Sequence, residues 1–336
     1  MIQAPPSVLK RLVTVSSVLF LLMVIAVFAG LSLGSTGGGF SSVWQSITGK
    51  LADDSMLNTI IWQVRFPRVL MAVLVGATLS LGGLVFQALL RNPLAEPYIL
   101  GVSGGSAIGA IIGILFGFSR FPGVCLMAFL GSIGTLFLIL VMTTGQSILR
   151  RDSLLLSGVM VNAFCAAVIM FLISMARDTK IHNIMFWLMG DLSMIEMWNV
   201  GMLAMILVPC FILIFWFSNA MNLLLLGKEM AMSMGINIKA VTVTLLVATS
   251  LMVSATVSHC GLLGFVGLVM PHLLRIPLGA DHRILVPACV LGGGAYMVLC
   301  DLLSRSLPQQ GEMPVGVITA MIGAPVFIIL LKKSGR

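Results

Sequence analysis

The side chains that could carry out chemistry are sparse in this sequence, and their spacing matches no catalytic or metal-binding pattern. The four histidines lie far apart, the six cysteines form no C-x-x-C pair, and no H-E-x-x-H segment occurs. Gly49-Lys50 and Gly227-Lys228 lack the rest of a G-x-x-x-x-G-K-[ST] phosphate loop. We therefore expect no catalytic residue, no metal site and no bound cofactor in this chain, and no ATP binding through such a loop.

Two arginines form the first arrangement of charges that suggests binding. Arg65 and Arg68 flank Pro67 and stand directly before a long apolar stretch. One arginine at a helix end is typical of an anchor whose charged group reaches the membrane interface. Two arginines around a proline indicate a more specific function, which the local sequence leaves open.

A second candidate is the segment 223–241, which contains the stretch GKEMAMSMG. It predicts a short helix from Lys228 to Met234, ended by Gly235. With methionine and alanine exposed, such a helix would fit the groove of a partner protein. The alternative is a simple connection between two longer helices.

Prolines and glycines mark a third region, 91–117. Pro93 and Pro97 interrupt any continuous helix and predict a rigid hairpin. The next helix carries glycine at every fourth position, which gives one smooth face for close approach of another backbone. That face serves tight packing or direct contact with a substrate. The residues are Gly101, Gly105, Gly109, Gly113 and Gly117.

Residues 83–94 and 267–278 are identical at eight of twelve positions, GLVFQALLRNPL against GLVMPHLLRIPL. This similarity indicates either an ancient duplication or two hairpins under the same structural demands.

The composition defines the elements that must position these residues. Of 336 residues, 59% are hydrophobic and 9% are charged, and apolar runs of about 20 residues recur along the chain. We therefore predict one all-α, polytopic membrane domain over 1–336, with interfacial helices within 35–64 and 177–198. The expected transmembrane helices cover 12–34, 67–90, 97–117, 122–144, 154–176, 199–218, 239–258, 261–274, 284–304 and 314–331.

The basic residues predict the orientation of these ten helices. With both termini in the cytoplasm, twelve of the nineteen lysines and arginines face inward, as the positive-inside rule requires. Arg65 and Arg68 then lie outside. The net charge of +8 follows from this distribution, so it does not indicate a nucleic-acid partner. Carboxylates in the middle of a predicted helix, which an ion-coupled secondary transporter would need, are absent from the sequence.

Several long stretches resemble the permease subunits of bacterial ABC importers for iron-siderophores, haem and vitamin B12. The most specific are NPLAEPYILGVS (92–103) and VGVITAMIGAPVF (315–327), and the resemblance covers essentially the whole chain. It implies a type II ABC importer permease fold in the bacterial inner membrane. It also implies a homodimer, two cytoplasmic ATPases that bind ATP and Mg, and an external or lipid-anchored substrate-binding protein.

The resemblance also suggests roles for individual residues. Three outer arginines would dock the binding protein: Arg65, Arg68 and Arg305. The segment 223–241 would be the coupling loop to the ATPase, through Lys228, Glu229, Met230, Ala231, Met234 and Gly235. Asn92, Leu94, Arg151 and Asp152 would belong to the inner gate. A ferric siderophore is the expected substrate because that branch is the commonest, with cobalamin or haem as alternatives.

Overall fold

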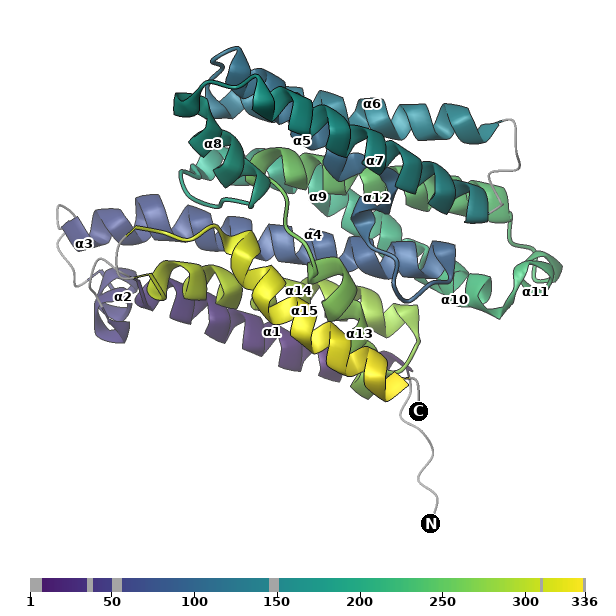
Figure 1. Cartoon of the computed structure of the whole chain (residues 1–336). Helices are drawn as coiled ribbons and strands as arrows, with labels where there is room; N and C mark the ends of the chain where they lie inside the picture. Colours follow the sequence, from purple (N-terminus) through teal and green to yellow (C-terminus); the bar gives the residue numbers. More distant parts are fainter. Residues whose placement is uncertain (1–7, 35–38, 50–55, 145–150, 309–310, 335–336) are drawn as a thin grey trace.

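The structure, a computed structural model, describes residues 8–34, 39–49, 56–144, 151–308 and 311–334, and these form helices without any strand (Figure 1). The long helices lie side by side along one direction. We call the end of the bundle that carries α8 (Asp178–Leu188) the α8 end, and the opposite end, which carries α11 (Lys228–Ser233), the α11 end.

Each of the ten expected transmembrane segments coincides with one helix. Seven of the described helices are long and apolar enough to cross a membrane, whereas α5, α13 and α15 are shorter apolar helices, so the expected count of ten is approximate. The ten are α1 (Val8–Ser32), α4 (Phe66–Leu90), α5 (Val102–Leu115), α6 (Cys125–Thr144), α7 (Arg151–Ser174), α9 (Met197–Trp216), α12 (Ile238–Cys260), α13 (Val266–Leu278), α14 (His282–Ser306) and α15 (Val315–Ser334).

Shorter helices occupy the connections. The segments 35–64 and 177–198, where interfacial helices were expected, contain the short helices α2 and α8, and Trp187 of α8 is buried. The remaining ones are α2 (Phe40–Ile47), α3 (Met56–Thr59), η1 (Ile60–Arg65), η2 (Pro97–Leu100), η3 (Arg120–Val124) and α10 (Ser218–Leu226).

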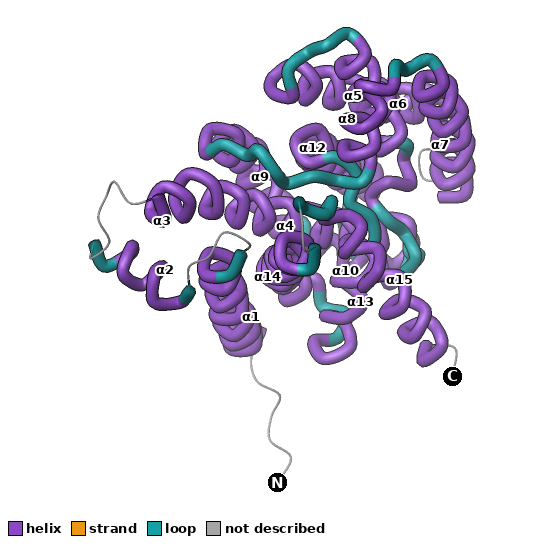
Figure 2. Tube along the Cα trace, turned by 60° about the vertical axis from the view of Figure 1, so that its left-hand side comes forward, coloured by secondary structure: helices purple, strands orange, loops and turns teal. Residues whose placement is uncertain are grey.

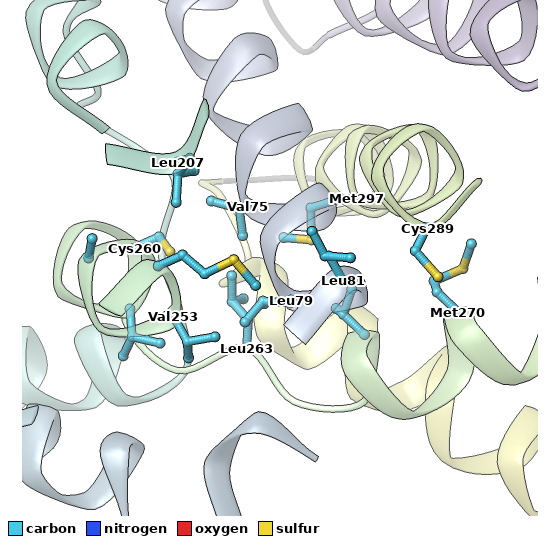
Figure 3. Packing of buried hydrophobic residues seen from close by; sticks show 14 of the residues in the cluster. Val75, Leu79, Leu81, Leu207, Val253, Cys260, Leu263, Met270, Cys289 and Met297 are labelled. Carbon is cyan, nitrogen blue, oxygen red and sulfur yellow. The ribbon is translucent and has the colours of Figure 1, made fainter. Parts of the chain in front are cut away.

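Helix α4 is the centre of the bundle. It contacts α9, α12, α13 and α14, and Figure 2 shows it among α9, α12 and α14. On one side of it α5, α6 and α7 pack together, and on the other side α1, α13 and α15 pack against α14. Figure 3 shows Val75, Leu79 and Leu81 of α4 meeting side chains of α9, α12 and α14. Most of α4 is buried because apolar residues surround its whole circumference.

Two helices begin later than the sequence suggested. Helix α5 starts at Val102 instead of residue 97, and α13 starts at Val266 instead of residue 261. In both cases a left-handed glycine, Gly101 (φ +69°) or Gly261 (φ +74°), stands in the segment before the helix and interrupts it. Residues 261–265 therefore run as non-helical chain before α13, whereas Pro97–Leu100 before α5 form the short helix η2.

The two similar stretches lie against each other. Gly83 of α4 and Gly267 of α13 are in backbone contact, because a Cβ on Gly83 would collide with the Gly267 backbone. The Gln87 amide donates to the Gly267 carbonyl at 3.3 Å, and Arg275 donates to the Gln87 side-chain oxygen at 3.4 Å. A pair of glycines at this crossing lets the two helices approach without intervening side chains.

Candidate functional site

The three arginines Arg65, Arg68 and Arg305 come together at the α8 end. Arg68 Nε lies 2.8 Å from Asp301 Oδ1, and Arg68 Nη1 lies 2.6 Å from Glu312 Oε2. Arg305 Nε lies 3.0 Å from Asp301 Oδ2, so Asp301 is shared by two guanidinium groups. We call these five residues the arginine cluster.

The arginine cluster also holds the end of α1. The Arg65 guanidinium donates to the carbonyl of Leu31 at 2.8 Å, and that of Arg305 donates to the carbonyl of Gly30 at 3.1 Å. These carbonyls lie in the last turn of α1, where no further helical N–H is present to bind them. The cluster therefore joins α1, α4 and α14 at one end of the bundle.

The burial of the arginine cluster differs from the expectation of exposed docking residues. Arg65, Arg68 and Arg305 are only 4%, 6% and 5% exposed. Arg68 and Arg305 pair with the carboxylate of Asp301, which is 0% exposed, and Arg65 is held by the Leu31 carbonyl. Glu312 is the accessible member, with its side chain 43% exposed. One part of the cluster was visible in the sequence, because Asp301 and Arg305 are spaced i, i+4 on one helix.

Helix α11 is present where the sequence placed it. The left-handed Gly235 (φ +82°) ends it, and the N–H of Ile236 donates to the carbonyl of Ala231 at 3.1 Å. Glu229, Met230 and Met234 are exposed, whereas Ala231 is buried, which corrects the expectation that alanine is exposed. The side chain of Lys228 lies outside the described residues.

The hairpin that follows α4 contains Asn92 and Leu94. The Leu94 N–H donates to Asn92 Oδ1 at 2.9 Å, and the Leu94 side chain is 45% exposed. The next residues fasten the hairpin to the segment before α13. Glu96 Oε1 accepts the N–H of Phe265 at 3.0 Å, and the Tyr98 hydroxyl bridges the N–H and the carbonyl of Leu263, both at 3.1 Å.

The other proposed gate residues, Arg151 and Asp152, form the first turn of α7, and their side chains lie outside the described residues. Further along α7, Asn162 Nδ2 donates to the Tyr98 carbonyl at 3.0 Å. Helix α7 is thereby tied to the same segment as the hairpin, but the structure does not bring Asn92 into a described contact with Arg151 or Asp152.

Three of the five regularly spaced glycines, Gly105, Gly109 and Gly113, lie on the face of α5 that packs on α6. A Cβ on Gly105 would meet the carbonyl oxygen of Gly131, and one on Gly109 would meet that of Met127. Gly101 and Gly117 lie outside α5, with φ of +69° and +78°, because each stands at a turn. The five therefore do not form one continuous face.

At the α11 end, a polar network joins α10 to the start of α14. Asn222 Nδ2 donates to Asp281 Oδ1 at 2.8 Å, and Asn222 Oδ1 accepts both the N–H and the ring Nδ1–H of His282 at 2.8 Å. Asp281 caps α14 by accepting the N–H of Arg283 at 3.0 Å. The side-chain hydrogen bond from Arg283 lowers the pKa of Asp281 to about 2. No feature of the sequence alone pointed to this network.

A cavity of about 490 Å³ at the α8 end lies between α8 and the turn before α6. Arg120 lines it and pairs with Asp191 at 2.6 Å. Burial raises the pKa of Asp191 and the Arg120 charge lowers it, with a net shift below the ordinary value.

All six cysteines are buried thiols, and among the described residues no three His, Cys, Asp or Glu side chains gather to hold a metal ion.

Seven long apolar helices and three shorter ones in the described part of the chain place it in the class of multi-pass helical membrane proteins. A family model, the FecCD transport family, matches residues 21–333, and this chain belongs to that family. It is the permease subunit of an ABC importer of the inner membrane, and a separate ATPase hydrolyses the ATP. Permeases of this kind work with an ABC ATPase and a substrate-binding partner.

Individual relatives support this assignment. The vitamin B12 import system permease BtuC of Salmonella arizonae is 39% identical over 295 residues, 87% of this chain and 86% of BtuC. BtuC of Salmonella typhimurium is 38% identical over 87% of each chain. A metal-chelate type ABC transporter solved in an inward-facing conformation has a TM-score of 0.83 and 33% identity, over 95% of this chain and 99% of its own. PsaBC from Streptococcus pneumoniae, with 18% identity and a TM-score of 0.58, shares the fold.

Proposed function

We propose that this permease imports a metal chelate, with a corrinoid of the vitamin B12 kind as its first candidate. The observation that carries this choice is the similarity to vitamin B12 permeases over 87% of the chain. The metal-chelate type relative supports the wider class, in which ferric siderophores and haem are the alternatives. The expectation of a ferric siderophore rested on frequency alone, and for that reason we place it second.

The test is uptake into proteoliposomes that contain the chain with its cognate ATPase, supplied with the cognate binding protein. We would compare cyanocobalamin, a ferric hydroxamate siderophore and haem, each with and without ATP. ATP-dependent accumulation of cyanocobalamin is the expected result. Accumulation of only the siderophore or haem would reassign the substrate, and uptake without ATP would reject the importer mechanism in favour of a secondary transporter.

Helix α11 is our candidate for the contact with the ATPase. Its exposed Glu229, Met230 and Met234 offer one charged and two adaptable apolar side chains to a groove on the partner. Glu229→Arg should abolish association with the ATPase while membrane insertion is unchanged. Lys332→Glu, a charge reversal at an exposed position outside the segment 223–241, is the control. Normal ATP-driven uptake by Glu229→Arg would exclude this role.

The α8 end is our candidate docking surface for the binding protein, through the arginine cluster. Reversing a buried arginine would unfold the chain, so the informative change is at the accessible Glu312. Glu312→Gln removes the acid that competes for Arg68, and it should strengthen binding of an acidic partner surface, most at low salt. An affinity that does not change at any salt concentration would argue against docking at Arg68.

A homodimer with both termini in the cytoplasm completes the proposal. The α11 end then faces the cytoplasm, and the path for the substrate lies between two copies, gated by Asn92, Leu94 and the first turn of α7. Helices α7 and α15 expose large apolar side chains that a second copy or lipid must cover. The mass of the purified protein and the accessibility of tags at both termini test these statements.

The transport cycle follows from these contacts. The docked binding protein acts at the α8 end, ATP binding closes the two ATPases against α11, and the helices between them alternate between two arrangements. Such a cycle requires that each partner bind one arrangement more tightly than the other. The permease itself catalyses no reaction. It provides the path for the substrate, and the binding protein and the ATPases determine which of its two arrangements is favoured.

A further inference from the structure

The network of Asn222, Asp281 and His282 offers a mechanical connection between the two ends of the bundle. Asn222 lies in α10, which leads directly into α11 through Gly227. Asp281 and His282 begin α14, a helix of 25 residues that spans about 37 Å at 1.5 Å per residue. At its other end α14 carries Asp301 and Arg305 of the arginine cluster.

The three hydrogen bonds of Asn222 are suited to transmit a displacement. All are 2.8 Å long, and His282 is 0% exposed. Both polar atoms of the Asn222 amide are used, one as donor to the cap of α14 and one as acceptor from its first residue. A shift of α10 must therefore either move the start of α14 or leave buried polar groups without partners, which is costly.

We propose that Asn222 is a positioning residue that couples movement of α11 to α14, and through α14 to the arginine cluster. This inference rests on the proposed roles of α11 at the ATPase and of the α8 end at the binding protein. The new part of the inference is that α14 connects these two contact regions, through the side chains of Asn222, Asp281 and His282. A displacement of α11 then moves α14, and this movement changes the position of the arginine cluster at the α8 end.

The test compares two asparagines on the same helix. Asn222→Ala removes the three hydrogen bonds, whereas Asn219→Ala changes an exposed residue three positions earlier in α10. With the full transporter in proteoliposomes, we would measure ATP hydrolysis with and without the loaded binding protein. We expect the stimulation ratio of Asn222→Ala to fall about fivefold or more, the lower range of coupling between sites, and that of Asn219→Ala to equal the native ratio.

A purely structural role would give a different result. Loss of folded transporter lowers basal and stimulated hydrolysis by the same factor, so the ratio would stay constant and the inference would be overturned. If Asn222→Ala does not fold, His282→Phe serves instead, because it removes only the ring hydrogen bond to Asn222 and keeps the other two. The ratio should then fall to an intermediate value, and a native ratio overturns the inference.

The proposed function can be lost separately from this inference. If the native chain shows no ATP-driven uptake with its partners, both fail. If native uptake proceeds and Asn222→Ala keeps the native stimulation ratio while ATPase remains bound, only the connection through Asn222 is rejected.

Discussion

Removal of the charge on Asp301 is the most direct test of the arginine cluster. Asp301→Asn keeps the shape of the side chain but takes away the negative charge shared by Arg68 and Arg305, 2.8 and 3.0 Å away. The side chains of these arginines are 7% and 6% exposed, so water cannot replace the lost partner. Arg68 keeps Glu312, which leaves Arg305 as the uncompensated charge.

The expected cost follows from this geometry. Loss of one partner from a buried ion pair costs about 3–5 kcal/mol, and the remaining Glu312 places Asp301→Asn near about 3 kcal/mol in the free energy of unfolding. Glu312→Gln is the matched control. Its side chain is 43% exposed, so the same change of charge should cost about 1 kcal/mol or less.

The measurement is unfolding of the purified permease in detergent micelles by denaturant titration, followed by tryptophan fluorescence. The double variant Asp301→Asn with Arg305→Met should be more stable than Asp301→Asn alone, because the unpaired charge is gone as well. If Asp301→Asn costs no more than Glu312→Gln, the cluster is hydrated and our description of it as a buried junction is wrong.

Three further predictions use the same unfolding assay. Gly109→Ala should lose about 1–3 kcal/mol because its Cβ meets the Met127 carbonyl on α6, whereas Gly134→Ala, with open space around it, should lose little. Tyr98→Phe should lose about 1–3 kcal/mol, since both backbone groups of Leu263 lose a partner. The pKa of Asp281 is lowered to about 2 from 3.8, so its contribution to stability is complete above pH about 4 and is lost as the pH falls towards 2. The stability difference between the native chain and Asp281→Asn should follow that course, and a constant difference down to pH 2 would contradict the assigned cause.

Much of the fold was predictable because lipid imposes a simple rule. A helix must be apolar for the width of the membrane, so runs of apolar residues located the seven long helices and the approximate positions of three shorter ones. The late starts of α5 and α13 were not predictable in the same way. Residues 97–100 form only the short helix η2, which Gly101 separates from α5. Residues 261–265 are as apolar as a helix, but they are non-helical, and Tyr98 and Glu96 bind the backbone of Leu263 and Phe265.

The parts of the candidate site that lie within one short stretch of sequence were predictable, and the contacts between residues far apart in the sequence were not. Helix α11 lies within nine residues and ends at a glycine, so its position was predictable from the local sequence, whereas the burial of Ala231 was not. The partners of Arg68 are 233 and 244 residues away, and no local pattern connects them. An arginine at the end of a helix therefore suggests a surface anchor from its sequence, and only the fold shows that it is buried beside a carboxylate.

The shortness of α5 and α13 has a consequence for biogenesis. Helices of 14 and 13 residues do not cover a hydrocarbon core of about 30 Å, so neither is stable in lipid when it leaves the ribosome alone. The segment before α5 obtains hydrogen bonds from residues around Phe265, which are synthesised 169 residues later. Helix α5 therefore reaches its final hydrogen-bonded position only after the segment around Phe265 has been synthesised.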